Sequence, residues 1–380
     1  MPDFLTPELL ALRADTERFV TEELVPLEAQ LGPTDSVPRD VARRVVDASR
    51  KQGLFGITQP EAFGGTQAGP LALTVVREAL ASAHLRVAAY VLGPGPGVLA
   101  AAEEPLRSSY LEPLMRGEKR MAFAFTEPDS APRPTWATRL GNQLVVNGCK
   151  SYVTGGATAD FVCAVVNVEA SEQNPKGTAM LVIDREGPGV RIDREFESLD
   201  GSGHVSMVFE DAPVPVHNVV GSIGEGMPRA LRNIDHVRLA VAAAAVGMAR
   251  WALEFVAEQL RAPHRSGTPL GEREGVRLRY AEARMQAYGA RSVLYRTARL
   301  AESDEDARNE GIAMKVFATE AAGKIVDTAV QLCGGQALVR GHPLERAYRE
   351  IRTLRLAEGA SDLLRINLAR GYLEFGAGRI

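Results

Sequence analysis

The chain has 380 residues, 45% of them hydrophobic and 24% charged, which is the balance of a globular protein large enough for two or three domains. The formal net charge of -4 gives no reason to expect a nucleic acid or an anionic membrane as a partner. The three cysteines are far apart and lack metal-ligand spacing, so we expect reduced thiols in a cytoplasmic protein and no metal site. Charged residues among the first twenty do not fit a signal peptide, and the Ala/Val-rich run 239–249 is too short for a membrane span.

The first third of the chain has helical periodicity. Apolar residues recur at helical spacing over residues 8–29, 38–53, 70–91 and 103–117. The glycines of Gly93-Pro-Gly-Pro-Gly97 have a spacing that suggests a dinucleotide-binding loop, but they follow a predicted helix, and the two prolines remove N–H donors. We predict a connecting loop there, and an N-terminal α-helical domain over residues 1–119.

The sequence pattern changes from helical periodicity to short β-rich runs at about residue 120. Short β-rich runs separated by Gly, Pro and Asp predict strands at 121–125, 144–148, 161–168, 178–183 and 205–209. They indicate a small antiparallel barrel or sandwich, a middle β domain over residues 120–223. Long Ala-rich helices then follow at 227–260, 270–302, 308–332, 343–356 and 360–373. Their short connections predict a C-terminal four-helix bundle over residues 224–380, so the predicted fold class is α+β.

Glu358 lies between the last two predicted helices, among residues of little bulk: Ala357, Gly359 and Ala360. Ser361 or Asp362 is a suitable N-cap for the helix that follows. One interpretation is an acid that complements the helix macrodipole. The other is a general base in a small, dry pocket.

Several motifs, taken in order, resemble the acyl-CoA dehydrogenase family of flavoproteins. They are Gly53-Leu-Phe-Gly-Ile57, Phe125-Thr-Glu-Pro128, Val146-Asn-Gly-Cys-Lys-Ser-Tyr-Val-Thr-Gly156, Phe209-Glu-Asp-Ala-Pro-Val-Pro215, Gly224-Glu-Gly226, Gln331-Leu-Cys-Gly-Gly335 and Ala357-Glu-Gly-Ala-Ser361. Each motif alone is weak evidence for the resemblance, but together they occur in the family's order, at plausible spacing, over nearly the whole chain. The resemblance implies the same α–β–α order, bound FAD, and α,β-dehydrogenation of an acyl-CoA thioester with electrons passed to an electron-transfer flavoprotein.

The resemblance implies that Glu358 is the base that removes the α-proton, in the subset of the family with its base on this last loop. Other members carry the base on an earlier helix, where this chain has no acid after Asp235. Gly359 beside the base would let the acyl chain approach closely. Asp235 and Arg238 match positions that handle the adenine and phosphate end of CoA, although an i,i+3 surface ion pair explains them equally well.

The FAD residues implied by the resemblance lie mainly in the β domain. Thr126 matches a threonine on the pyrimidine side of the flavin, Thr154 one near N5, and Tyr152 an aromatic residue that packs on the ring. Plain β-propensity is the alternative explanation for both threonines. The predicted cofactor-binding set also contains Phe123, Phe125, Pro132, Ala360 and Asp362.

Gln331, Gly334 and Gly335 match a segment that meets the FAD of a neighbouring subunit, although the glycines also suit a helix end. The resemblance therefore implies a homotetramer, with a dimer as the other possibility. An arginine usually meets the FAD pyrophosphate in a run ending Phe-Gly, where this chain has Ser266, so Arg265 or Arg261 would have to substitute.

The chain departs from the family in the run Asp129-Ser-Ala-Pro-Arg-Pro134, where a Gly- and Ser-containing run is usual. Pro132 has neither a hydroxyl nor an N–H, and Ala360 replaces a common threonine. These changes leave the acyl group, the carrier and the electron acceptor open. The alternatives are a related flavoenzyme acting as an oxidase or an enoyl-thioester reductase, and a non-enzymatic binding relative on the same scaffold.

Overall fold

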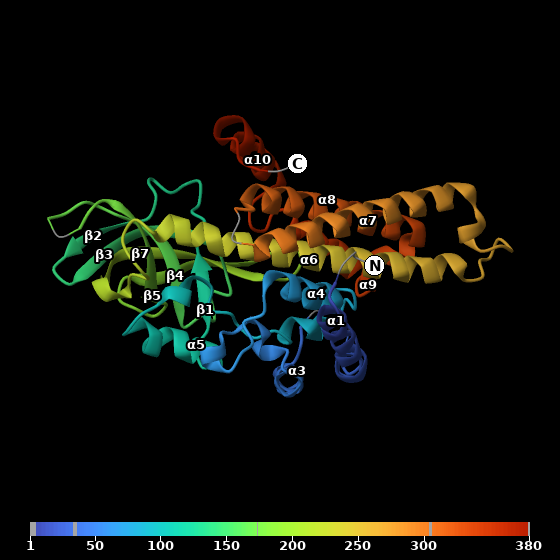
Figure 1. Ribbon diagram of the computed structural model, residues 1–380, viewed down its shortest axis with the longest axis horizontal. Helices are drawn as coiled ribbons and strands as arrows, with labels where there is room; N and C mark the ends of the chain where they lie inside the picture. Colours follow the sequence, from blue (N-terminus) through green and yellow to red (C-terminus); the bar gives the residue numbers. More distant parts are fainter. Residues whose placement is uncertain (1–4, 33–35, 173, 304–305, 379–380) are drawn as a thin grey trace. The chain divides into compact units, whose positions relative to one another are not determined.

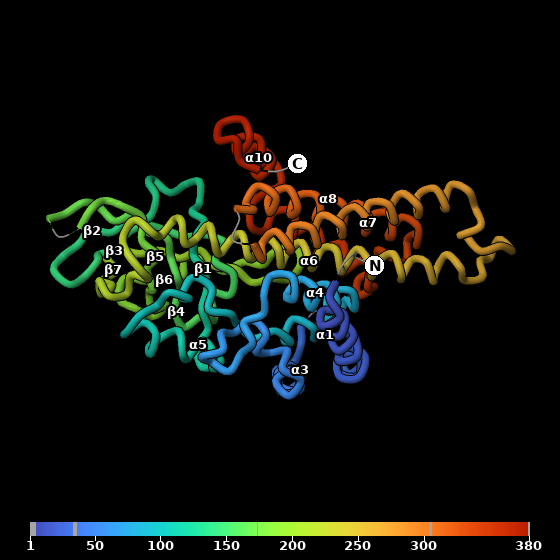
Figure 2. Tube along the Cα trace, in the orientation of Figure 1, coloured from blue at the N-terminus to red at the C-terminus, as the bar shows by residue number. Residues whose placement is uncertain are grey.

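The computed structural model of the protein describes residues 5–32, 36–172, 174–303 and 306–378. It divides into two compact units (Figure 1 and Figure 2). The first unit joins Met1–Thr58, Gln67–Leu92 and Asp235–Ile380, so it contains helices from both ends of the chain. The second unit comprises Gln59–Thr66 and Gly93–Ile234 and carries the β-sheet.

The N-terminal helices of the first unit are α1 (Pro7–Phe19), α2 (Val25–Glu28), α3 (Arg39–Gln52) and α4 (Pro70–Ala81). Thr6 caps α1 by accepting a hydrogen bond from the Leu9 N–H, and Gly53 ends α3 at φ 80°. A π-helical turn, Val20–Leu24, interrupts the helix predicted over 8–29. Pro26 explains the interruption, because it cannot donate to the preceding turn.

The predicted helix 70–91 is too long. Helix α4 ends at Ala81, and a 3-10 segment, Arg86–Tyr90, follows. His84 lies between them at φ 49°, and its ring contacts Glu350 at 2.9 Å and stacks on Trp251 at 4.1 Å. The helix therefore stops where tertiary contacts hold His84 in a left-handed conformation.

In the described part of the chain, five α-helices follow the β-sheet: α6 (Gly226–Arg261), α7 (Glu274–Glu302), α8 (Arg308–Cys333), α9 (Pro343–Leu354) and α10 (Ser361–Phe375). From Asp235 onward they belong to the first unit. Their buried cores consist largely of alanine, and small side chains let helix backbones approach closely. Helix α6 is long and apolar enough to cross a membrane, but 61% of its apolar window is buried, as in a core helix.

The second unit contains α5 (Glu112–Arg116) and a seven-stranded sheet. The strands are β1 (Met121–Ala124), β2 (Trp136–Leu140), β3 (Gln143–Thr154), β4 (Phe161–Val168), β5 (Gly177–Asp184), β6 (Val190–Glu197) and β7 (Gly203–Pro215). Their order is β1-β4-β2-β3-β7-β6, with β5 paired to β4.

The sheet is mixed, because β4 pairs in parallel with both β1 and β2 while the other pairs are antiparallel. The prediction of an antiparallel β domain is therefore wrong for these two strand pairs. Strands β2 and β6 were also absent from the predicted set. In β6 the apolar residues Val190, Ile192 and Phe196 keep a period of two, but Arg194 interrupts it and most of the other residues are charged, so the pattern is too weak to identify a strand.

Strand β3 carries an irregularity that matters for the site. Its pairing with β7 shifts register between Lys150 and Val153. Tyr152, inside that shift, has φ 53°, and its side chain is 63% exposed. Such a bulge re-aims a side chain, and strained backbone of this kind concentrates at functional sites.

Candidate active site

The turn between α9 and α10 contains Glu358. Helix α9 ends at Leu354, and α10 begins at Ser361. Glu358 has φ 54° and Gly359 has φ 108°, so two consecutive residues adopt positive φ. A Cβ at Gly359 would lie 3.0 Å from a Leu364 methyl group, so both φ and space favour glycine there.

Two cations from distant helices surround this turn. Arg238 of α6 donates from Nε to the Glu358 carbonyl oxygen at 3.2 Å. Lys315 of α8 donates from Nζ to the Gly359 carbonyl oxygen at 2.9 Å. Both side chains are buried, with exposed fractions of 8% for Arg238 and 0% for Lys315.

Glu358 itself is half-buried. Burial raises the pKa of its carboxyl above the ordinary value, while the charges of Arg238 and Lys315 act in the opposite direction. A carboxylate with weakened solvation and increased proton affinity suits a general base better than a fully hydrated one.

Asp235 lies beside Arg238, which donates to it from Nη1 at 2.8 Å, and Arg308 approaches it at 3.4 Å. Burial raises the pKa of Asp235, although both arginines oppose the shift. The structure therefore brings the predicted residues Glu358, Gly359, Asp235 and Arg238 together in one cluster.

Ala360 is the N-cap residue of α10, and Asp362 lies in its first turn. The Asp362 side chain is 94% exposed and pairs with Arg365 at 2.7 Å. This is the geometry of a solvated acid near a helix N-terminus, where a negative charge is favourable.

Gln331, Gly334 and Gly335 lie at the far end of α8, where Gly334 terminates the helix at φ 72°. Sixteen residues separate Gln331 from Lys315, which is roughly 24 Å along a helix axis. Arg265 lies in the connection between α6 and α7, roughly 35 Å along α6 from Arg238. Within one chain these four residues are therefore remote from Glu358.

The predicted flavin-facing segments of the second unit adjoin each other, because the Ser151 N–H donates to the Thr126 carbonyl at 2.8 Å. Thr126, Tyr152 and Thr154 are all exposed. The Tyr152 ring contacts Phe196 edge-on at 5.1 Å, and Thr154 Oγ1 hydrogen-bonds His204 at 3.1 Å. Two hydroxyls and one aromatic ring thus lie on neighbouring segments of one unit.

Phe123 and Phe125 stack at 6.0 Å and pack, half-buried, against the core of the second unit. Pro132 is exposed in the 129–134 loop, where the neighbouring Arg133 stacks over Trp136 at 4.0 Å. The base of this loop is held by Glu127, which accepts from buried Lys150 at 2.7 Å and from the Thr135 N–H at 2.8 Å.

Lys315 and Lys150 donate hydrogen bonds to the predicted site residues Gly359 and Phe125, and the sequence analysis missed both lysines. Lys315 is the one charged residue in the apolar run Gly311-Ile-Ala-Met-Lys-Val-Phe317, and a lone charge in a buried helix face is a usable indication. Lys150 lies inside a motif that was noticed, but its pairing with Glu127 joins separate segments and has no local pattern.

The helical unit carries a half-buried carboxylate, and the β unit carries exposed hydroxyls and an aromatic ring, which are residue types that a flavin-dependent oxidoreductase can use. Sequence profiles of the acyl-CoA dehydrogenase N-terminal, middle and C-terminal domains match residues 6–118, 122–212 and 224–373. The chain belongs to the acyl-CoA dehydrogenase family. It is an FAD-binding oxidoreductase that acts on CH–CH bonds.

Its relatives include enzymes named for opposite reaction directions. An acyl-CoA dehydrogenase of Bacillus subtilis is 27% identical over 97% of this chain and 99% of its own length. A 3-(aryl)acrylate reductase of Clostridium sporogenes is 25% identical over 98% and 100%. The caffeyl-CoA reductase-Etf complex subunit CarC of Acetobacterium woodii is 26% identical over 84% and 87%.

Solved structures share the fold. A probable acyl-CoA dehydrogenase from Mycobacterium abscessus superposes with a TM-score of 0.82 at 29% identity, covering 96% of this chain and 98% of that one. This likeness confirms the predicted fold class of helical, β and helical segments.

The residues of the second unit fit the flavin that the family binds. The exposed Thr126 and Thr154 hydroxyls can hydrogen-bond the rim of a flat ring, and the exposed Tyr152 ring can pack against it. Tyr152 combines a positive φ with an exposed ring that contacts Phe196 edge-on, and strained backbone of this kind concentrates at functional sites.

Proposed function

We propose that the protein is an FAD-dependent acyl-CoA dehydrogenase in which Glu358 is the catalytic base. The observation that carries the proposal is the half-buried Glu358, whose proton affinity is raised by burial and whose loop is held by Arg238 and Lys315. A fully exposed helix-start acid would need none of these contacts.

In the proposed reaction the Glu358 carboxylate takes the α-proton of a saturated acyl thioester. The β-hydrogen leaves with its electron pair, and a trans double bond forms between Cα and Cβ. FAD, when bound, supplies the acceptor of that hydride. Thr126, Tyr152 and Thr154 would hold and orient the flavin, and the partial burial of Glu358 strengthens the base.

Asp235 and Arg238 were predicted to contact the adenine end of CoA. Their position beside Glu358 supports a role at the reacting end of the substrate instead. Arg238 links Asp235 to the Glu358 backbone, so we propose that the pair orients the base and its thioester.

A second candidate is the reverse reaction, reduction of an enoyl or aryl-acrylate substrate. The two reductase relatives and the proline-containing 129–134 loop favour it. The same Glu358 would then deliver a proton to Cα. We propose an electron-transfer flavoprotein as the electron partner in either direction, and a cytoplasmic location.

The two directions are distinguished by anaerobic flavin spectroscopy of the purified holoprotein. We expect one class of saturated acyl-CoA, tested from short to long and branched chains, to bleach the flavin absorbance. A reductase would instead show no bleaching, and its chemically reduced flavin would be reoxidised by an enoyl-CoA or by a free aryl acrylate. Rapid peroxide formation on turnover would identify an oxidase.

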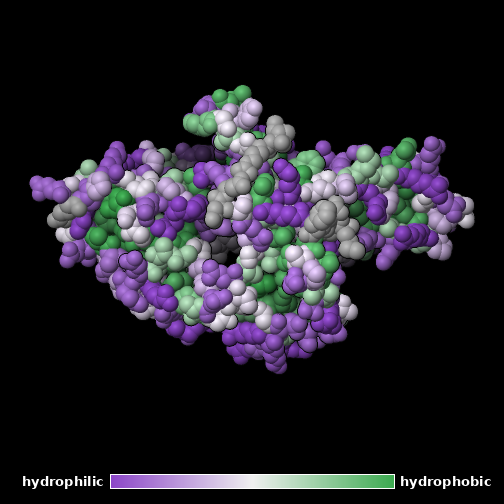
Figure 3. Space-filling view, viewed as in Figure 1, coloured by the Kyte–Doolittle hydropathy of each residue, from purple (hydrophilic) through white to green (hydrophobic). Residues whose placement is uncertain are grey.

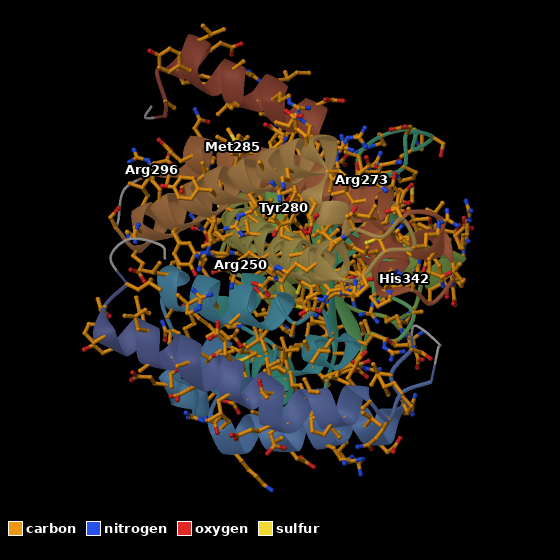
Figure 4. The ribbon with its side chains drawn as sticks, turned by 90° about the vertical axis from the view of Figure 1, so that its right-hand side faces the viewer. Arg250, Arg273, Tyr280, Met285, Arg296 and His342 are labelled. Atoms are coloured by element: carbon orange, nitrogen blue, oxygen red, sulfur yellow. The ribbon has the colours of Figure 1, made fainter. Side chains whose placement is uncertain are left out.

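We also propose that the chain assembles into a homotetramer or a dimer through exposed apolar helix faces. Helix α7 exposes Leu278, Met285 and Tyr288 at 66%, 67% and 75%, and Figure 4 labels Met285 on its outer side. Helix α10 exposes Leu373 and Phe375 at 80% and 70%, and hydrophobic residues appear on its surface in Figure 3. Such large apolar faces typically mark interfaces.

Replacing Met285 and Tyr288 together by glutamate should therefore produce a smaller species in light scattering. Two buried charges without partners in an apolar interface would cost several kcal/mol, enough to dissociate it. Arg279→Glu on an exposed position of the same helix is the control. A double variant of unchanged mass would exclude this face as the interface.

A further inference from the structure

Lys315 is a fully buried lysine whose ammonium lies against the backbone on both sides of Glu358. Its Nζ donates to the carbonyl oxygen of Gly359 at 2.9 Å and to that of Arg355 at 3.2 Å. The Arg355 carbonyl also accepts from the N–H and the hydroxyl of Ser361, at 3.1 and 3.2 Å. The ends of the 355–359 stretch are therefore tied to one point on α8.

Arg238 supplies a third bond to the same stretch, on the Glu358 carbonyl at 3.2 Å. The backbone there is unusual for a residue with a side chain, since Glu358 has φ 54°. A strained conformation of this kind persists only where its surroundings enforce it. Lys315 and Arg238 donate to these three carbonyls from distant helices, and Ser361 is the local donor to that of Arg355.

A neutral donor would satisfy the carbonyls at lower cost, because burying an ammonium group is expensive. Hydrogen bonding alone therefore does not explain the positive charge of Lys315. The nearby Glu358 carboxylate does, because its negative charge favours the ammonium form. Burial, together with the charge of Arg238, lowers the pKa of Lys315 to about 8, so the ammonium form is present at neutral pH. The other charged groups packed around this turn are Asp235 of α6, Arg308 and Glu320 of α8, Arg355 of the turn and Arg365 of α10.

We propose that Lys315 is a positioning residue for the reaction, which holds the 355–359 backbone so that the Glu358 carboxyl is presented to the substrate, and which keeps that carboxyl ionised. The inference rests on the proposed role of Glu358 as base. It assigns to one side chain both the shape of the loop and the charge state of the base.

The test compares Lys315→Met with Lys324→Met, an exposed lysine on the same helix. In the holoprotein, amide hydrogen exchange of peptides covering 355–361 should be about tenfold faster in Lys315→Met, because the loop loses two hydrogen bonds. Exchange in α7 should stay as in the wild type. The infrared carboxyl band of Glu358, identified by subtracting the Glu358→Gln spectrum, should titrate at higher pH, because a neighbouring cation is gone.

The kinetic result should be a fall in the rate of flavin reduction with little change in KM, because the lysine does not itself contact substrate. If Lys315→Met does not fold, Lys315→Gln keeps a donor without the charge and should still raise the titration midpoint of Glu358. Unchanged loop exchange together with an unchanged midpoint would overturn the proposal. Exchange and infrared titration do not require turnover, so they test Lys315 even if Glu358→Gln were to retain activity and the proposed function failed.

Discussion

Replacing Glu358 with glutamine should lower the anaerobic rate of flavin reduction by about a hundredfold to ten-thousandfold. Glutamine keeps the size and can keep the backbone bonds from Arg238 and Lys315, but it cannot accept the α-proton. The visible spectrum of bound flavin should stay as in the wild type, since the side chain is replaced by one of equal shape.

The pH dependence of the flavin-reduction rate follows from the ionisation of the Glu358 carboxyl. Only the ionised carboxylate is a base, and burial raises the pKa of Glu358, so the wild-type rate should fall as the pH drops through that raised value. Glu374→Gln is the matched control, because this acid lies on α10 but is exposed and paired with Arg370 at 2.7 Å. Retained flavin reduction in Glu358→Gln, or an equal loss in Glu374→Gln, would contradict the assignment.

The largest stability effect should come from Glu78 of α4. Its side chain is 1% exposed and contacts Arg291 at 2.6 Å, Arg250 at 3.0 Å and the Tyr295 hydroxyl. Figure 4 labels Arg250, which reaches this carboxylate from α6. Glu78→Gln removes the charge that two arginines and a buried phenol face, and we expect a loss of about 3 kcal/mol in the free energy of unfolding, measured by denaturant titration.

The control for Glu78 is Glu254→Gln, which touches the same Arg250 at 3.9 Å but is 70% exposed, so its effect should stay within about 0.5 kcal/mol. Burial alone would raise the pKa of Glu78, but Arg291, Arg250 and Tyr295 lower it overall. A carboxyl whose pKa is lowered by folding stabilises above its unfolded pKa, and that stabilisation is lost as the pH falls through the folded pKa. The difference between wild type and Glu78→Gln should therefore shrink in acid, and a constant difference would point to packing as its cause.

Much of the fold was predictable because local chemistry and tertiary structure agree. Helix α3 begins one residue after Pro38 and ends at Gly53, and α6 runs from Gly226 to Arg261 against a predicted 227–260. The predicted element boundaries are wrong where contacts with distant parts of the chain determine the local conformation. His84 ends the region predicted as helix 70–91 through contacts with Glu350, which is 266 residues away.

The site was predictable in part for the same reason. Glu358, Gly359 and Ala360 are recognisable from one short run of small residues around an acid. The cations that give the acid its surroundings lie 120 residues earlier, in Arg238, and more than 40 residues earlier, in Lys315. No local pattern couples them to Glu358, and only the packing of α6 and α8 brings them to it.

The most direct test of Glu358 as base is exchange of the substrate α-hydrogen with solvent. The holoprotein is incubated anaerobically in D2O with the acyl-CoA that bleaches its flavin, and the deuterium content of the recovered thioester is measured by mass spectrometry. We predict deuterium at Cα with the wild type and none above background with Glu358→Gln. Equal incorporation by both proteins would show that another group removes the α-proton.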